Sequence, residues 1–207
     1  MLRAGLTGGI ACGKTAVAEM FAGLGAYILN ADTLAHELYR PGEPVYHELV
    51  KRFGREIVKP DGAIDRARLA VLAFDGGRVE ELNRIVHPAV IARQQELMAA
   101  IGAKDPSAVV LAEAALIFEA GAGKRFDKII VVTCKPEQKA ARLAQRMGID
   151  QAAAQLEVER RMKSQIPDKE KARRADYVID NSGTLEETRR QVEKVFRELK
   201  ALSGNVT

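Results

Sequence analysis

The chain begins with a stretch whose residue types fit phosphate binding. Residues 5–15 read GLTGGIACGKT, and in them Gly8, Gly13, Lys14 and Thr15 have the spacing G-x-x-x-x-G-K-[ST]. In such a loop the backbone curls so that its N–H groups point at phosphate oxygens. The lysine reaches the β- and γ-phosphates, and the threonine hydroxyl coordinates Mg²⁺. The stretch predicts a nucleoside triphosphate site, and the alternative is a glycine-rich turn with a surface lysine.

Two acidic residues stand where strands are expected to end. Asp32 follows the expected strand Tyr27–Asn30, and Glu113 follows the expected strand Val109–Ala112. Ligands of open α/β sheets gather at the carboxyl ends of the strands. Asp32 could act there as a general base for an attacking hydroxyl, or it could N-cap a helix over Thr33–Arg40. Glu113 could bind Mg²⁺ directly or through water, and the alternative is a helix cap or a solvated strand end.

Basic residues are concentrated in one segment. Residues 135–174 contain 11 Lys and Arg against 6 Asp and Glu, whereas the remainder is balanced to within one charge. Lys139, Arg142 and Arg146 are spaced to share one face of a helix. Arg161 is a further candidate on the following helix. Arginines on a mobile helical segment can neutralise charge on a transferred phosphoryl group, and solvated side chains are the alternative.

Placing these residues together requires a sheet. Short apolar runs predict buried parallel strands over Leu2–Thr7, Tyr27–Asn30, Val109–Ala112, Lys128–Cys134 and Tyr177–Ile179. Helical spacing of apolar residues predicts helices over Lys14–Ala22, Pro136–Met147, Gln151–Gln165 and Glu186–Leu202. Residues 32–102 are almost wholly helical, with breaks at Pro41-Gly42, Asp61-Gly62, Gly76-Gly77 and His87-Pro88. The expected fold class is α/β, with a five-stranded parallel sheet flanked by helices.

The expected organisation is one domain with two helical insertions. The core is expected to comprise residues 1–31, 105–135 and 173–207, and the insertions residues 32–104 and 136–172. A chain of 207 residues with 47% hydrophobic residues can bury a substantial core. No run approaches the ~20 apolar residues of a membrane span, and the glycine loop follows the first residue too closely for a secretory signal. We therefore expect a cytoplasmic protein.

The cysteines and histidines show no metal-ligand spacing. Cys12 lies inside the glycine loop and Cys134 ends an apolar run, so two unpaired thiols are the simplest interpretation. His36, His47 and His87 are scattered along the chain.

Over nearly its whole length the chain resembles the dephospho-CoA kinase family. The matching stretches are LTGGIACGKT (6–15), NADTLAHELYRPGEPVYHELVKRFG (30–54), DGAIDRARLAVLAF (61–74), IVHPAV (85–90), LIFEAG (116–121), EQKAARLAQR (137–146), RRMKSQ (160–165) and ADYVIDNSG (175–183). The resemblance implies a P-loop kinase fold with a helical region for the CoA precursor and a helical lid. It also implies transfer of the γ-phosphate of ATP to the 3′-hydroxyl of dephospho-CoA, the last step of coenzyme A synthesis.

The resemblance further assigns roles to particular residues. The catalytic residues would be Asp32 as the base, with Lys14 and Arg142 acting on the phosphates. The ATP site would comprise Gly8, Gly9, Ala11, Cys12, Gly13, Lys14, Thr15, Ala16, Arg142 and Asn181, the last in a loop flanking adenine. The acceptor site would comprise Thr7, Asp32, His87 and Arg161, although His87 could instead cap a helix. Mg²⁺ would bind Thr15 and, through water, Glu113.

Three positions depart from the usual family pattern. The family loop has Gly-Ser where this chain has Ala11-Cys12, and Thr often stands where this chain has Ala16. Because backbone amides hold the phosphates, Ala11 is acceptable if its φ and ψ lie in an ordinary region. The family pattern Asp-x-Pro-Leu-Leu is replaced by EAALI at residues 113–117, so the Mg²⁺ contact of Glu113 is expected to be shifted or water-mediated.

Two other functions are open alternatives. One is another P-loop kinase that acts on a nucleoside monophosphate or a similar hydroxyl acceptor. The other is a nucleotide-dependent RNA-binding protein that uses the basic segment 135–174, although an aromatic content of 5% and the absence of Trp disfavour base stacking. We expect ATP and dephospho-CoA as partners, no nucleic acid or membrane partner, and a monomer or weak homo-oligomer.

Overall fold

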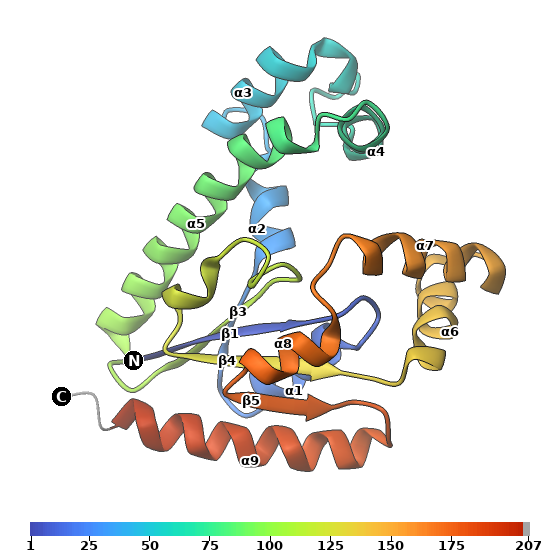
Figure 1. Ribbon diagram of the computed structural model, residues 1–207. Coiled ribbons are helices and arrows are strands. Elements are labelled where there is room, and N and C mark those ends of the chain that lie inside the picture. Colours follow the sequence, from blue (N-terminus) through green and yellow to red (C-terminus); the bar gives the residue numbers. More distant parts are fainter. Residues whose placement is uncertain (205–207) are drawn as a thin grey trace. The chain divides into compact units, whose positions relative to one another are not determined.

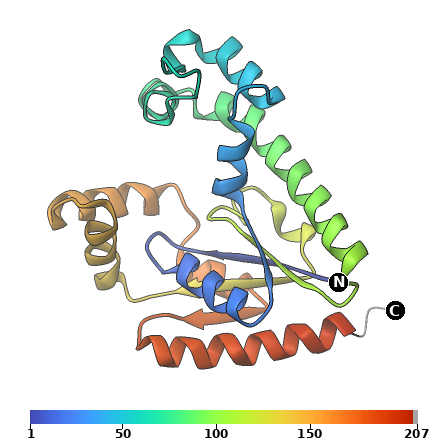
Figure 2. The same ribbon diagram turned by 180° about the vertical axis from the view of Figure 1, so that it is seen from behind.

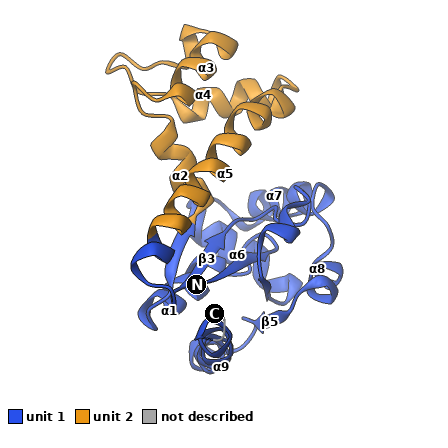
Figure 3. Ribbon diagram, turned by 90° about the vertical axis from the view of Figure 1, so that its left-hand side faces the viewer, with its two compact units in different colours: residues 1–29, 101–207 blue, residues 30–100 orange. Residues whose placement is uncertain are grey.

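The computed structural model describes residues 1–204 and divides into two compact units. The first unit comprises residues 1–29 and the chain from residue 101 onward, and the second comprises residues 30–100 (Figure 3). The helices expected to form a lid belong to the first unit, and the helical region expected to bind the acceptor makes up the second.

The first unit is built on a five-stranded parallel sheet with the strand order β2-β3-β1-β4-β5. The strands are β1 (Leu2–Gly8), β2 (Tyr27–Asn30), β3 (Val109–Glu113), β4 (Lys128–Thr133) and β5 (Tyr177–Asp180). Every predicted strand is confirmed, with ends that differ by no more than one residue. Because β1 is central, the loop that follows it opens at the middle of the carboxyl edge, where ligands of such sheets bind.

Alternating side chains of the strands pack into two separate clusters. Leu6 of β1 and Ile130 of β4 face one cluster, which includes Phe21 of α1 (Lys14–Gly23) and residues of α9 (Leu185–Gly204). Figures 1 and 2 show α1 and α9 along the same face of the sheet. On the other face, Ile129 and Val131 pack with residues of the segment that follows β3. Helices therefore need to cover both faces, as the continuous apolar strands predict.

The remaining helical elements of the first unit lie between β3 and β4 and between β4 and β5 in the sequence. They are η3 (Ala122–Arg125), α6 (Pro136–Met147), α7 (Gln151–Lys163) and α8 (Asp168–Arg174). The prediction for α6 is confirmed at both ends, and α7 ends two residues before its predicted end. The sequence analysis missed α8, because seven residues that are mostly charged show no apolar periodicity.

The second unit is helical, as predicted. Its elements are α2 (Ala31–Leu38), α3 (Pro44–Phe53), η1 (Arg55–Ile57), α4 (Arg66–Ala70), η2 (Val71–Asp75) and α5 (Val79–Lys104), the end of which enters the first unit. The predicted break at His87-Pro88 is wrong, because α5 continues through Pro88. A proline in a helix removes one N–H donor, but the hydrogen bonds of the neighbouring turns maintain the helix. In residues 1–204, no helix combines the length and apolar character that a membrane crossing requires.

Candidate active site

The glycine-rich loop holds Lys14 across its own backbone. The loop connects β1 to α1, and the ammonium of Lys14 donates hydrogen bonds to the carbonyl oxygens of Gly8 and Gly9, each at 3.1 Å. Burial lowers the pKa of Lys14, while Cys12 and Glu113 oppose that shift. Lys14 is half-buried, and an ammonium that rests on neutral carbonyls in such surroundings gains strongly from an anionic partner. The alternative of a surface lysine on a plain turn is therefore wrong.

Two residues of the loop adopt left-handed backbone conformations. Gly13 has φ 87°, and a Cβ there would collide with the side-chain nitrogen of Asn181. Ala11 has φ 56°, and it is the only residue other than glycine with a positive φ in the described part of the chain. The condition of an ordinary conformation for Ala11 is therefore not met. An L-residue in this region costs about 1 kcal/mol or more, which the rest of the loop must offset.

Asn181 braces the loop from the end of β5. Its buried side chain donates to the carbonyl oxygen of Cys12 at 2.9 Å and accepts from the Thr188 hydroxyl at 3.0 Å. Its backbone carbonyl accepts from Arg142 Nη2 at 2.9 Å. Asn181 therefore connects the loop, α9 and α6, and its side-chain donors and acceptors are directed at protein atoms. A place beside adenine stays a prediction for the segment around Asn181.

We expect Asn181→Asp to lower the free energy of unfolding by about 1–3 kcal/mol, because a buried carboxylate would face the Cys12 carbonyl in place of a donor. Equilibrium urea unfolding measures this loss. The half-buried Asn83 of α5 provides the matched control, and Asn83→Asp is expected to stay within about 0.5 kcal/mol of the unsubstituted protein. Equal losses for both variants would contradict the bracing role.

Thr15 and Glu113 lie together at the carboxyl edge. The Thr15 hydroxyl donates to Glu113 Oε1 at 3.1 Å, and Glu113 is only 6% exposed at the last position of β3. Both the solvated strand end and the helix cap are therefore wrong for Glu113. Hydroxyl and carboxylate oxygens are ligands that Mg²⁺ accepts, together with substrate phosphates and water. The described residues contain no group of three or more His, Cys, Asp or Glu side chains that could hold a metal ion by themselves.

The three basic residues expected on one face of α6 have different environments. Lys139 is buried, and its ammonium lies 2.6 Å from Asp168 Oδ2. Arg142 binds the Asn181 carbonyl through Nη2, while its buried Nη1 has no hydrogen-bond partner among the described residues. Arg146 is exposed, and its charge lowers the pKa of Lys14, so its field reaches the loop. The sequence analysis expected Arg146 on the same face as Arg142 but included only Arg142 in the ATP site.

The Lys139–Asp168 ion pair joins α6 to α8 beside Gly9. Burial alone would lower the pKa of Lys139, but the hydrogen bond to Asp168 and the charges of Cys12, Asp168 and Cys134 together outweigh it, and the pKa is raised. We expect Asp168→Asn to destabilise the protein by about 2–3 kcal/mol, less than for a fully buried pair because 24% of the Asp168 side chain is exposed. The double variant with Lys139→Met should regain most of that loss in urea unfolding. Strictly additive losses would show that the pair is not coupled.

Two residues expected in the acceptor site are engaged elsewhere. The Thr7 side chain is completely buried, and its hydroxyl donates to the Ala115 carbonyl at 3.1 Å. This arrangement disfavours direct contact between Thr7 and a substrate. Arg161 forms an ion pair with Glu157 of the same helix at 2.6 Å.

Ala16, which was expected in the ATP site, lies in the first turn of α1, where its side chain brings no polar group to the loop.

In the second unit, Asp32 lies in the first turn of α2 with an exposed side chain. The N-cap is Asn30, whose side chain accepts from the Thr33 backbone at 2.9 Å. The capping alternative for Asp32 is therefore wrong, and its carboxylate is not used to start the helix. The predicted helix over Thr33–Arg40 begins and ends two residues earlier than expected.

Three residues near Asp32 were missed by the sequence analysis. The Arg66 guanidinium contacts the His36 ring at 2.8 Å, and burial together with Arg66 lowers the pKa of His36. Burial and the charge of Asp32 raise the pKa of Tyr39. The spacing of His36 and Tyr39 from Asp32, four and seven positions along the chain, could have placed all three on one helix face. Arg66 lies on α4 and becomes a neighbour only in the tertiary structure.

His87 lies within α5 with an exposed side chain. Because the helix continues on both sides of His87, the helix-capping alternative is wrong. Its place in the acceptor site stays a prediction.

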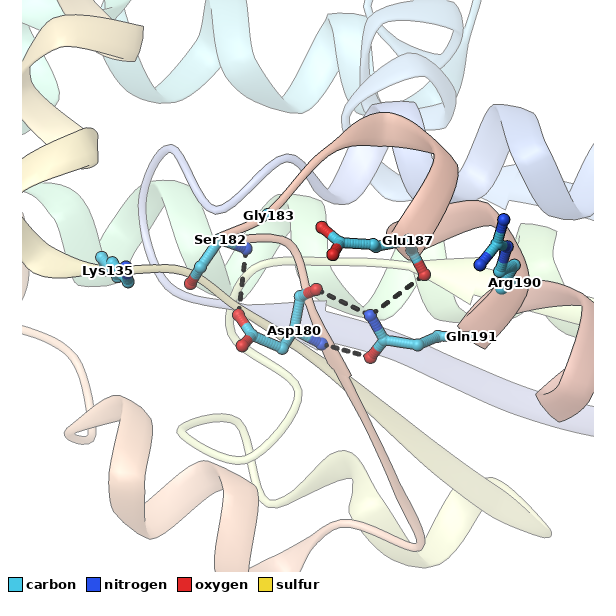
Figure 4. A pocket seen from close by; sticks show the side chains of 7 residues that line it. All are labelled: Lys135, Asp180, Ser182, Gly183, Glu187, Arg190 and Gln191. Atoms are coloured by element: carbon cyan, nitrogen blue, oxygen red, sulfur yellow. Dashed lines mark hydrogen bonds between the residues drawn. The ribbon is translucent and has the colours of Figure 1, made fainter.

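A polar surface depression of about 500 Å³ borders the loop that contains Asn181 (Figure 4). Its lining residues are Lys135, Asp180, Ser182, Gly183, Glu187, Arg190 and Gln191. Gln191 exchanges two hydrogen bonds of 2.9 Å with the Asp180 backbone, and the Ser182 N–H donates to Asp180 Oδ1 at 2.9 Å. These bonds order the segment after β5, which is expected to flank adenine.

The parallel sheet, the phosphate loop after its central strand and the helices with basic residues around that edge define a P-loop kinase. The sequence model of the dephospho-CoA kinase family matches residues 2–187. The dephospho-CoA kinase of Aquifex aeolicus is 43% identical over 200 residues, which cover 96% of this chain and 98% of that protein. The enzyme of Syntrophotalea carbinolica is 45% identical and covers 93% of this chain and 89% of its own length. The chain belongs to the dephospho-CoA kinase family.

Solved structures agree with this assignment. A Thermus thermophilus crystal structure superposes with a TM-score of 0.76 at 32% identity, covering 96% of this chain and 97% of that chain. The dephospho-CoA kinase from Campylobacter jejuni gives a TM-score of 0.70 at 26% identity, covering 99% of this chain and 98% of its own. A shikimate kinase from Acinetobacter baumannii shares the fold alone, with a TM-score of 0.53 at 16% identity over 100% of this chain and 96% of its own.

Proposed function

We propose that this chain transfers the γ-phosphate of ATP to the 3′-hydroxyl of dephospho-CoA, giving coenzyme A and ADP. Two observations together carry the proposal: the family match covers residues 2–187, and the half-buried Lys14 of the phosphate loop rests on backbone carbonyls. Phosphoryl transfer depends mainly on positioning and electrostatic stabilisation, which this loop is built to supply.

On the nucleotide side, the loop amides and Lys14 would hold the triphosphate. Thr15 and Glu113 would supply oxygen ligands for Mg²⁺, which would neutralise phosphate charge. Arg142 Nη1 is a buried donor that an anion would satisfy, and Arg146 adds positive potential at Lys14. These positive charges would stabilise the negative charge that develops on the transferred phosphoryl group. Their effect is larger in partly buried surroundings than in water.

On the acceptor side, Asp32 would orient and deprotonate the attacking hydroxyl. Its exposed carboxylate and the separate N-cap on Asn30 leave it available for that role. The Arg66–His36 contact places a cation in the same unit, which suits a substrate that carries phosphate groups.

The experiment that tests the proposal measures ADP release from MgATP with a panel of acceptors: dephospho-CoA, a nucleoside monophosphate and shikimate. Only dephospho-CoA is expected to accelerate ADP release, and mass spectrometry should find the product heavier by one phosphoryl group. Acceleration by the nucleoside monophosphate alone would favour the other kinase class. RNA binding that weakens steeply with salt, without acceptor-dependent ADP release, would favour the RNA-binding alternative.

A further inference from the structure

The two cysteines of the chain are in contact, although they are 122 positions apart in sequence. Cys12 lies in the phosphate loop and Cys134 follows β4, and their Sγ atoms are 3.2 Å apart. Both are free thiols; Cys12 is fully buried and Cys134 is half-buried. A disulfide has an S–S distance of about 2.04 Å, so the sulfurs need to approach by about 1.2 Å.

The surroundings make the two thiols chemically unequal. The hydrogen bond between the two thiols lowers the pKa of Cys134, and Lys139 and Arg142 add to this effect against burial and Asp168. The pKa of Cys12 is raised by its hydrogen bond to Cys134, by burial and by Asp168. The thiolate is the nucleophilic form of cysteine. Cys134 is therefore the thiol that reacts first with an external oxidant, and Cys12 is placed to attack the oxidised sulfur.

We propose that Cys12 and Cys134 form a reversible disulfide that switches off nucleotide binding, with a hydroperoxide as the oxidant. Cys134 Sγ attacks one peroxide oxygen, the O–O bond breaks, and the departing oxygen takes the thiol proton, leaving a sulfenic acid. Cys12 Sγ then attacks Cys134 Sγ, so that an S–S bond forms, the S–O bond breaks, and the hydroxide leaves with the Cys12 proton as water. Two thiols supply the two electrons that reduce the peroxide, and a dithiol reductant reverses the change.

The loop explains why this bond would oppose ATP. Cys12 stands between two left-handed residues, Ala11 and Gly13, and its carbonyl is held by Asn181. Pulling Cys12 toward Cys134 changes the dihedral angles on both sides and turns the amides that must converge on phosphate. If the disulfide weakens ATP binding, ATP must weaken the disulfide by the same factor. We therefore expect MgATP to shift the thiol–disulfide equilibrium toward the two thiols by that factor.

The test uses the reduced full-length protein treated with hydrogen peroxide, and it follows the covalent state and ATP binding together. We expect a mass lower by two hydrogen atoms, a linked peptide pair containing Cys12 and Cys134, and ATP affinity reduced at least about tenfold. Dithiothreitol should restore both. Because calorimetric ATP binding needs no acceptor, this result is independent of which hydroxyl the enzyme phosphorylates.

The variant Cys134→Ser separates the proposal from general oxidative damage. Its reduced form is expected to bind ATP within about twofold of the unsubstituted protein and to keep that affinity in peroxide. Cys134→Ala should behave in the same way, which guards against an effect of one replacement on folding. If both variants lost ATP binding in peroxide as fast as the unsubstituted protein does, the proposed disulfide switch would be contradicted. A linked peptide in a protein that binds ATP normally would also contradict it, as would oxidation to sulfinic acids without the linked peptide.

Discussion

Replacing Asp32 by asparagine is expected to reduce turnover by about 10²–10⁴-fold, the usual contribution of a positioned acid or base. Asparagine keeps the size of the side chain and removes the group that accepts the hydroxyl proton. ATP affinity should be nearly unchanged, because the triphosphate is assigned to the loop after β1 and not to α2. Steady-state assays with dephospho-CoA, together with calorimetric ATP binding, measure the two quantities separately.

Asp75 provides a matched control for this variant. It is an exposed carboxylate of the same unit, in η2, and no role in the chemistry is assigned to it. Asp75→Asn should keep turnover close to that of the unsubstituted protein. Turnover of Asp32→Asn at the level of this control would remove Asp32 from the mechanism and leave positioning by Mg²⁺ and the basic residues as the source of the rate.

Replacing Lys14 by alanine is expected to weaken ATP binding and to lower turnover by about 10²–10³-fold, as for the loss of one positioned donor. Lys14 is half-buried, and the loss of hydration in the free protein lowers its pKa. Because the ammonium of Lys14 is already partly desolvated before ATP binds, its ion pair with a phosphate requires little further desolvation. Calorimetry with MgATP and steady-state assays give the two losses.

The control for Lys14 is Lys194, an exposed lysine on α9 of the same unit. Its replacement by alanine removes the same charge. Lys194→Ala should leave both quantities unchanged within error. Circular dichroism and thermal unfolding show whether Lys14→Ala keeps the fold, which β1 and α1 support through their own packing. A folded Lys14→Ala protein with normal ATP affinity would contradict the assignment of the loop.

The sequence was sufficient for most of the fold, because the relevant signals are local. The five strands are short apolar runs, of which β1, β3 and β4 are almost wholly buried, and their ends agree with the structure to within one residue. The phosphate loop is a contiguous motif, so the roles predicted for Gly13, Lys14 and Thr15 rest on only eight residues. The local rule for proline failed at Pro88, because the long helix α5 tolerates the loss of one hydrogen bond.

The tertiary structure alone decided which side chains meet. It brought Glu113 under Thr15, Asn181 onto the loop carbonyl of Cys12, and Arg66 onto His36. It also placed Cys134 against Cys12, where the sequence suggested only two separate thiols. The physical reason is that periodicity and turn chemistry act between near neighbours in the chain, whereas these contacts depend on the order of strands in the sheet. The sequence by itself therefore determined the class of chemistry, and the packing of distant segments determined how the loop is braced and how it could be switched.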